Sequence, residues 1–170
     1  MDPLLKQVRS VLVTTSGYWD SLCQCVSPEL LKQSPAEGEW SALECLQHLI
    51  DTEQVFQTRI KAFLAGENFP GFDPDADGSP AGVELNQIEL AEEFTRLRQS
   101  GIDLLDTVTP DDYDRTAIHG ELGQVTLKQL LNEWAGHDLN HTVQAQRAMM
   151  QPFITACGPW QRYFTDHVVG

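Results

Sequence analysis

Residues 41–66 read SALECLQHLIDTEQVFQTRIKAFLAG, and this stretch decides the fold class because it combines a helix start signal with a helical period. Ser41 followed by Glu44 forms a capping box, in which each side chain accepts a hydrogen bond from the other residue's backbone N–H. Apolar residues then recur at three- and four-residue spacing as far as Gly66: Leu43, Leu46, Leu49, Ile50, Phe56, Ile60 and Phe63. The stretch therefore predicts an amphipathic helix over residues 41–65.

Three further segments show the same period. Apolar stripes predict helices over residues 3–26, 84–108 and 126–150, the last of which begins with a second capping box, Thr126 and Gln129. Pro110 and Pro152 are expected to end the last two helices, and a short element should begin at Pro159. Strand-like alternation is absent, and residues 65–83 form a long acidic loop. Four long amphipathic helices predict an all-α four-helix bundle, built as one domain over residues 1–170.

Charge and composition exclude several classes of protein. The chain has 25 acidic and 11 basic residues, a net charge of −14, and this acidity without a basic patch argues against a nucleic-acid partner. No apolar run approaches the roughly 20 residues of a membrane span, and the N-terminus lacks the layout of a secretory signal. The sequence thus predicts a soluble, cytoplasmic protein. Its four cysteines lack zinc-finger spacing and are expected to be reduced thiols, mostly buried.

Three of the five histidines are candidates for a metal site. His137 and His141 lie four residues apart in one predicted helix, a spacing that places two imidazoles on one face. His48 lies midway along the predicted helix 41–65, among core-facing residues. Each of them has an ordinary alternative, a histidine that is simply hydrogen-bonded at the surface or in the core. If the bundle brings the three together, they can bind a divalent metal and leave a coordination position open, as catalytic sites do.

Several motifs resemble those of the DinB/YfiT-like family of metal-binding four-helix bundles, and the likeness runs from Trp40 to about Phe164. They are Trp40–Glu44 with His48–Asp51, Pro70–Ala76, His119–Gly123 with Thr126–Leu127, Trp134–Asp138 with His141 and Gln144, and Gly158–Trp160 with Tyr163.

The resemblance implies an up-down-down-up bundle that forms a homodimer. It also implies a nickel or zinc ion with His48, His137 and His141 as ligands, and an activity on a small-molecule substrate: transfer of a low-molecular-weight thiol, isomerisation or hydrolysis. The expected function is therefore that of a metal-dependent transferase or hydrolase. Two alternatives stay open: a non-catalytic metal-binding module for ligand sensing or protein interaction, and an acidic protein that docks a basic partner.

Acidic residues near the histidines are candidates for the remaining chemistry. Asp51 lies three residues after His48 and is a candidate to orient that ring, and Glu133 lies one turn before His137. Both are candidate general bases, although a solvated surface acid is the more ordinary reading of each. Asp138, which follows His137, is likewise interpreted as a solvated surface acid and is the weakest candidate, because adjacent helix positions diverge by about 100°. His119 is expected to stabilise a turn and His167 to be solvated.

Residues 73–84 match the D-x-D-x-D-G-x₅-E pattern of calcium loops. Such a loop needs a helix that ends where the pattern begins, and Pro70 and Gly71 disfavour one there. The pattern is therefore interpreted as an acidic loop rather than a calcium site.

Overall fold

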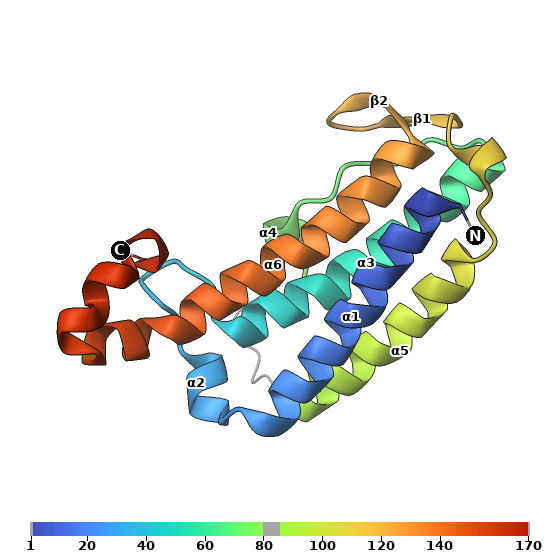
Figure 1. Cartoon of the computed structure of the whole chain (residues 1–170). Helices are drawn as coiled ribbons and strands as arrows, with labels where there is room; N and C mark the ends of the chain where they lie inside the picture. Colours follow the sequence, from blue (N-terminus) through green and yellow to red (C-terminus); the bar gives the residue numbers. More distant parts are fainter. Residues whose placement is uncertain (1, 80–85, 170) are drawn as a thin grey trace.

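Four long helices pack side by side in the computed structural model, which describes residues 2–79 and 86–169 (Figure 1). They are α1 (Pro3–Cys25), α3 (Ala42–Ala65), α5 (Gln87–Leu105) and α6 (Leu127–Ala156). Helices α1 and α3 each pack against both α5 and α6. In Figure 1, α1 and α6 run in one direction and α3 and α5 in the other. The predicted all-α, up-down-down-up four-helix bundle is confirmed.

Because α3 and α5 are parallel, the chain between them must return along the bundle, and its described part contains one short turn of helix, α4 (Pro74–Asp77). Residues 67–73 before α4 are not helical, so the entering helix of a calcium loop is missing there. Glu84 of the calcium pattern and the predicted start of the third helix both lie outside the described residues.

Local signals set the helix ends. Ser41 N–H donates to Glu44 Oε2 over 2.7 Å and Glu44 N–H to Ser41 Oγ over 3.3 Å, and the corresponding Thr126–Gln129 distances are 2.8 and 3.2 Å. Gly66 ends α3 with φ +74°, a left-handed conformation that favours glycine. Both predicted capping boxes are confirmed.

The sequence prediction was wrong at Pro152, which lies inside α6 rather than at its end. A proline within a helix removes one backbone donor and crowds the preceding turn. Ile154, in the turn after the proline, is buried, and burial of an apolar side chain favours continuation of the helix. A 3₁₀ helix, η2 (Gly158–Tyr163), follows where a short terminal element was predicted, and a second one, η3 (Thr165–His167), comes after it.

Smaller elements between the long helices were not predicted. A short helix, α2 (Pro28–Lys32), and a 3₁₀ turn, η1 (Pro110–Asp112), follow α1 and α5 respectively. Strands β1 (Thr116–His119) and β2 (Gly123–Thr126) form an antiparallel hairpin before α6. The sequence hides this hairpin because Ala117 and His119 are the buried residues of β1, whereas its most apolar residue, Ile118, is exposed.

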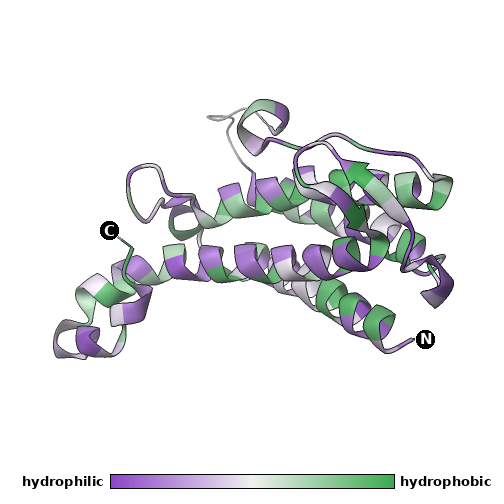
Figure 2. Ribbon diagram, turned by 90° about the horizontal axis from the view of Figure 1, so that it is seen from above, coloured by the Kyte–Doolittle hydropathy of each residue, from purple (hydrophilic) through white to green (hydrophobic). Residues whose placement is uncertain are grey.

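The core consists of two apolar clusters, one toward each end of the bundle. The first is centred on Leu12, Phe56, Ile60 and Leu131, and the second on Trp19, Leu46, Phe94 and Ala145. Figure 2 shows purple and green bands alternating along the helices, as expected of amphipathic helices whose apolar faces point inward. No helix in the described part of the chain combines the length and the hydrophobicity that a membrane span requires. All four cysteines are free thiols, but only Cys23 and Cys45 are buried.

Candidate metal centre

Helices α3 and α6 bring three histidines together. His48 Nε2 lies 3.1 Å from His137 Nε2, and one ring nitrogen from each of His48, His137 and His141 can be chosen so that all three lie within 4.8 Å of one another. The i, i+4 spacing places His137 and His141 on the face of α6 that packs against α3. His48 reaches that face from α3, so residues about 90 positions apart in sequence form one cluster.

A neighbouring side chain fixes the orientation of the His141 ring. His141 Nδ1 lies 2.8 Å from Gln144 Oε1. An amide oxygen can only accept, so Nδ1 carries the proton and the lone pair of Nε2 is available. Aromatic rings wall the cluster: the Trp40 ring centroid lies 4.9 Å from that of His48 and 5.9 Å from that of His141, and Phe56 lies 5.5 Å from His137.

Burial keeps these imidazoles neutral. It is the main cause that lowers the pKa of His48 to about 4 and that of His137 to about 3, and it also lowers the pKa of His141. The positive charge that a neighbouring histidine would carry lowers the pKa of His48 and His137 further. At neutral pH all three rings are therefore in the form that binds a metal.

The donor set fits a divalent ion. Two nitrogens bound at 2.0–2.1 Å to one tetrahedral ion lie about 3.3 Å apart, close to the 3.1 Å between His48 Nε2 and His137 Nε2. Without a cation, two lone pairs at that distance repel unless one ring carries its proton there. Among the described residues no aspartate, glutamate or cysteine completes this group, so three protein ligands would leave at least one coordination position for water or substrate.

The two acids proposed as general bases lie in different surroundings. Asp51 is half-buried, and its carboxylate accepts hydrogen bonds from Gln47 Nε2 at 3.1 Å and from Ser79 N and Oγ at 2.9 and 2.8 Å. It thereby joins α3 to the returning segment after α4. Glu133 is exposed on α6, and its negative charge partly opposes the lowering of the Arg59 pKa by burial. A catalytic role for Asp51 or Glu133 stays a prediction.

The other two histidines lie elsewhere. His119 is buried in β1, and its Nδ1 accepts hydrogen bonds from the backbone N–H groups of Glu121 and Leu122, at 3.1 and 3.2 Å. This is the turn-stabilising role expected of it. His167 is exposed, as expected.

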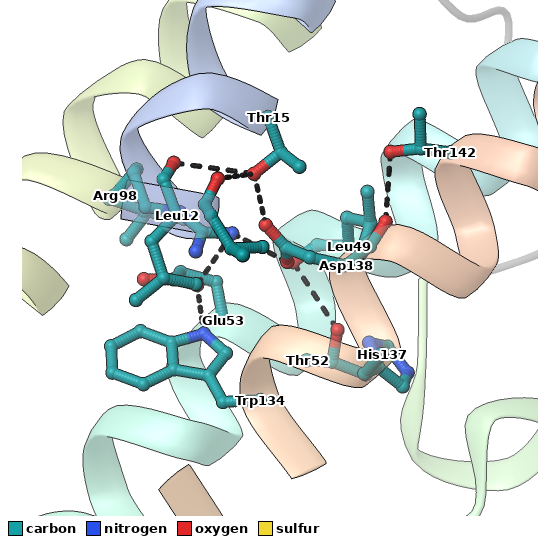
Figure 3. A network of polar contacts seen from close by, with 12 residues as sticks. Leu12, Thr15, Leu49, Thr52, Glu53, Arg98, Trp134, His137, Asp138 and Thr142 are labelled. Atoms are coloured by element: carbon teal, nitrogen blue, oxygen red, sulfur yellow. Dashed lines mark hydrogen bonds and ion pairs between the residues drawn. The ribbon is translucent and has the colours of Figure 1, made fainter. Parts of the chain in front are cut away.

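A buried ionic network beside the histidines was missed. Asp138, interpreted from sequence as a surface acid, is only 1% exposed, and that interpretation was wrong. Arg98 Nη2 lies 2.8 Å from Asp138 Oδ1 and 3.2 Å from Glu53 Oε2. Thr15 donates a short hydrogen bond to Asp138, and Trp134 Nε1 donates one to Glu53 over 2.9 Å (Figure 3). Each long helix thus contributes to one polar layer.

The signal that could have revealed this layer is helical spacing. Asp138 lies four residues after the buried Trp134 and seven before the buried Ala145, and Glu53 lies between Ile50 and Phe56 in the same way. Acids at core positions of an apolar stripe predict a buried partner, because an unpaired charge there would be costly. The polar layer lies between the two apolar clusters of the core.

Comparison with known proteins agrees with this architecture. No curated protein sequence matches the chain. YfiT from Bacillus subtilis, described as a probable metal-dependent hydrolase with an unusual four-helix bundle topology, superposes with a TM-score of 0.77 at 16% identity, over 90% of each chain. The DinB-like protein YjoA from Bacillus subtilis superposes with a TM-score of 0.58 at 19% identity, over 86% of this chain and 92% of its own. At these identities the two structures establish the fold alone. The sequence profile of the DinB superfamily matches residues 12–145, most of the chain, and the protein therefore belongs to the DinB superfamily.

Proposed function

We propose that this protein is a divalent-metal-dependent enzyme that acts on a small molecule by hydrolysis, isomerisation or thiol transfer. The observation that carries the proposal is the convergence of three neutral imidazoles, with no fourth protein ligand in the described group. A structural metal site is normally closed by four protein ligands, whereas a catalytic one keeps a position open. The description of YfiT as a probable metal-dependent hydrolase favours hydrolysis among the three reactions.

The residues around the cluster have separable roles in this proposal. His48, His137 and His141 hold the ion, which when bound lowers the pKa of a coordinated water or thiol. Gln144 fixes the proton of His141 on Nδ1, and Trp40 and Phe56 exclude bulk water from the rings. Asp51 or Glu133 accepts a proton at the mouth of the site.

The identity of the ion and of its partners belongs to the same proposal. Imidazole ligands suit both nickel and zinc, and we propose one of these two metals. A low-molecular-weight thiol is the proposed co-substrate if the reaction is a transfer. We also propose a homodimer, in which an apolar helix face depleted of acids forms the interface. Sedimentation at micromolar concentration should then show a species of twice the mass of the chain.

Metal analysis of protein made without a histidine tag tests the site. The unaltered protein should bind one nickel or zinc ion per chain. His137→Ala and His141→Ala should each lose stoichiometric metal while circular dichroism retains the helical signal, because the apolar clusters hold the bundle together. His167→Ala, which removes an exposed histidine outside the cluster, is the matched control and should retain the ion. Full occupancy in both His137→Ala and His141→Ala would refute the site.

Turnover separates the enzyme from a non-catalytic metal-binding module. Metal-loaded protein should hydrolyse small esters such as 4-nitrophenyl acetate, or consume an added thiol in the presence of an electrophile, faster than His137→Ala does. One bound ion per chain combined with equal rates for the two proteins on all such substrates would favour the module.

A further inference from the structure

A cavity of about 440 Å³ shares two lining residues, Trp40 and Gln144, with the surroundings of the histidine cluster, and its volume is within the range of small-molecule sites. Its walls come from the segment before α3, from α6 and from the C-terminal segment, and they include Glu39, Trp40, Asn140, Gln144, Arg147 and Val169. Two of these residues also contact the histidines: Trp40 packs against His48 and His141, and Gln144 Oε1 accepts a hydrogen bond from His141 Nδ1. A molecule in this cavity is therefore only one side chain away from the cluster.

Arg147 is the cation of the described lining, and its hydrogen-bonding capacity is largely unused. Its Nε is buried without a hydrogen-bond partner in the described part of the chain. Its Nη2 donates to Asp166 O over 3.5 Å, at the long limit of a hydrogen bond. A guanidinium carries five N–H donors in a planar fork, and a buried donor left without an acceptor is unfavourable.

The C-terminal segment does not need Arg147 to stay in place. Gln151 binds that segment twice: its Nε2 donates to His167 O over 2.9 Å, and its Oε1 accepts from Val169 N over 3.2 Å. These bonds hold Val168 and Val169 against the cavity. The Nη groups of Arg147, which unlike Nε are not among the buried unpartnered atoms, are thus available for a ligand.

We propose that this cavity binds the substrate of the metal site through a carboxylate group, with Arg147 as its anchor. The inference rests on the proposed function and specifies its substrate class as small monocarboxylates. A guanidinium fork matches the two oxygens of a carboxylate, and the side-chain amides of Asn140 and Gln144 line the same cavity. The described lining has one cation, Arg147, and one acid, Glu39, and the whole protein carries a net charge of −14. This charge balance disfavours the binding of a doubly charged phosphate.

The spacing along α6 separates the anchor from the metal site. Arg147 follows His141 by six residues, which is about 9 Å along the helix axis. A carboxylate held by Arg147 therefore places the reacting group of the substrate several bonds away, toward the histidines. The apolar walls formed by Trp40, Val143 and Ala148 suit a hydrocarbon body between the two ends.

Paired probes test this assignment. Butyrate, hexanoate and phenylacetate should each bind to the metal-free protein more tightly than their neutral amides, and hexyl phosphate should bind more weakly than hexanoate. Metal is removed by a chelator so that a carboxylate cannot bind to an ion instead. Titration calorimetry gives the affinities, and the indole N–H resonance of Trp40, assigned with Trp40→Phe, should shift on binding.

Arg147→Gln should weaken carboxylate binding roughly tenfold or more while leaving amide binding unchanged. Arg96→Gln makes the same charge change at an exposed position on α5 and should leave both affinities unchanged. Gln151→Ala releases the C-terminal segment, so it should weaken the binding of acids and of amides equally. This result would distinguish the structural role of Gln151 from the role of Arg147 as a ligand anchor.

The assignment is overturned if no acid binds better than its amide, or if Arg147→Gln weakens both equally. If hexyl phosphate binds more tightly than hexanoate, the cavity is a site for phosphate esters and the assignment to carboxylates is wrong. Metal occupancy is measured separately on the same variants: Arg147→Gln should keep the ion. If the unaltered protein takes up no nickel or zinc when these ions are supplied, yet binds carboxylates through Arg147, the proposed function is contradicted but this cavity remains a carboxylate site.

Discussion

Arg98→Met would remove the guanidinium that pairs with two buried carboxylates while keeping an apolar side chain of similar length. Arg98, Glu53 and Asp138 are each only 1–2% exposed as side chains, and the ion pairs measure 2.8 Å to Asp138 and 3.2 Å to Glu53. Burial is the main cause that raises the pKa of Glu53 to about 7, so this residue holds its proton more readily than an exposed carboxyl group. The substitution therefore mainly removes the ion pair between Arg98 and Asp138.

A buried carboxylate that has lost its partner is expected to take up a proton, because protonation costs less free energy than leaving the charge buried and unpaired. For a carboxyl group with a solution pKa of about 4, protonation costs about 1.4 kcal/mol per pH unit, or about 4 kcal/mol at pH 7. This agrees with the roughly 3–5 kcal/mol lost when a buried ion pair is broken. We therefore expect the free energy of unfolding of Arg98→Met to be about 4 kcal/mol lower than that of the unaltered protein at pH 7.

The loss should depend on pH in a definite direction. A carboxyl group whose pKa is raised by folding stabilises the folded state below its unfolded pKa, and that stability is lost as the pH rises. At pH 5 protonation of such a group costs only about 1.4 kcal/mol, so the difference between variant and unaltered protein should shrink by about 2.7 kcal/mol.

Urea unfolding of the metal-free proteins at pH 7 and pH 5, followed by circular dichroism, measures both values. Arg96→Met is the matched control, because Arg96 is exposed on the same helix and pairs with Glu93; it should change stability little at either pH. An equal loss at the two pH values would refute the electrostatic reasoning. It would assign the effect to lost packing of the guanidinium on Phe94, 4.8 Å away.

Two further outcomes follow from the same region. In Gly101→Ala the new Cβ would lie 2.3 Å from Glu53 Oε1 and 2.9 Å from Trp134 Cζ2, so thermal unfolding should show a loss of about 1–3 kcal/mol, whereas Gly17→Ala, with open space around the new Cβ, should cause none. Because burial lowers the pKa of His48 to about 4 and that of His137 to about 3, protons should compete with a bound metal for these two ligands only near pH 4. Equilibrium dialysis should find the ion retained at pH 5; complete release by pH 6 would contradict this.

Strong local signals made most of the fold predictable. The two capping boxes and the apolar stripes located the helices to within a few residues at most ends, because a cap and a 3.6-residue period leave few alternatives. The pairing of His137 with His141 followed from spacing alone. The inclusion of His48 did not, since a position on another helix depends on packing, and there the family resemblance supplied the expectation.

Tertiary contacts decided the features that were missed. The β1–β2 hairpin buries Ala117 and His119 and leaves Ile118 exposed, so its pattern contradicts the hydrophobicity on which a strand prediction depends. The turn of α6 after Pro152 forms although a proline disfavours it. The burial of Ile154 in this turn depends on tertiary packing, which the local sequence does not reveal.

Asp138 shows how a single helix can serve two neighbours. His137 and His141 meet His48 on α3, while Asp138 binds Thr15 on α1 and Arg98 on α5. Adjacent helix positions differ by about 100°, so these contacts lie on different faces of α6. A buried ion pair is weak support for stability, but its short, directional contacts restrict rotation of α6 about its axis. The polar layer thereby orients the two imidazoles toward α3. The turn of about 100° between His137 and Asp138 makes Asp138 a poor metal ligand, but it lets Asp138 orient the metal site from another face of α6.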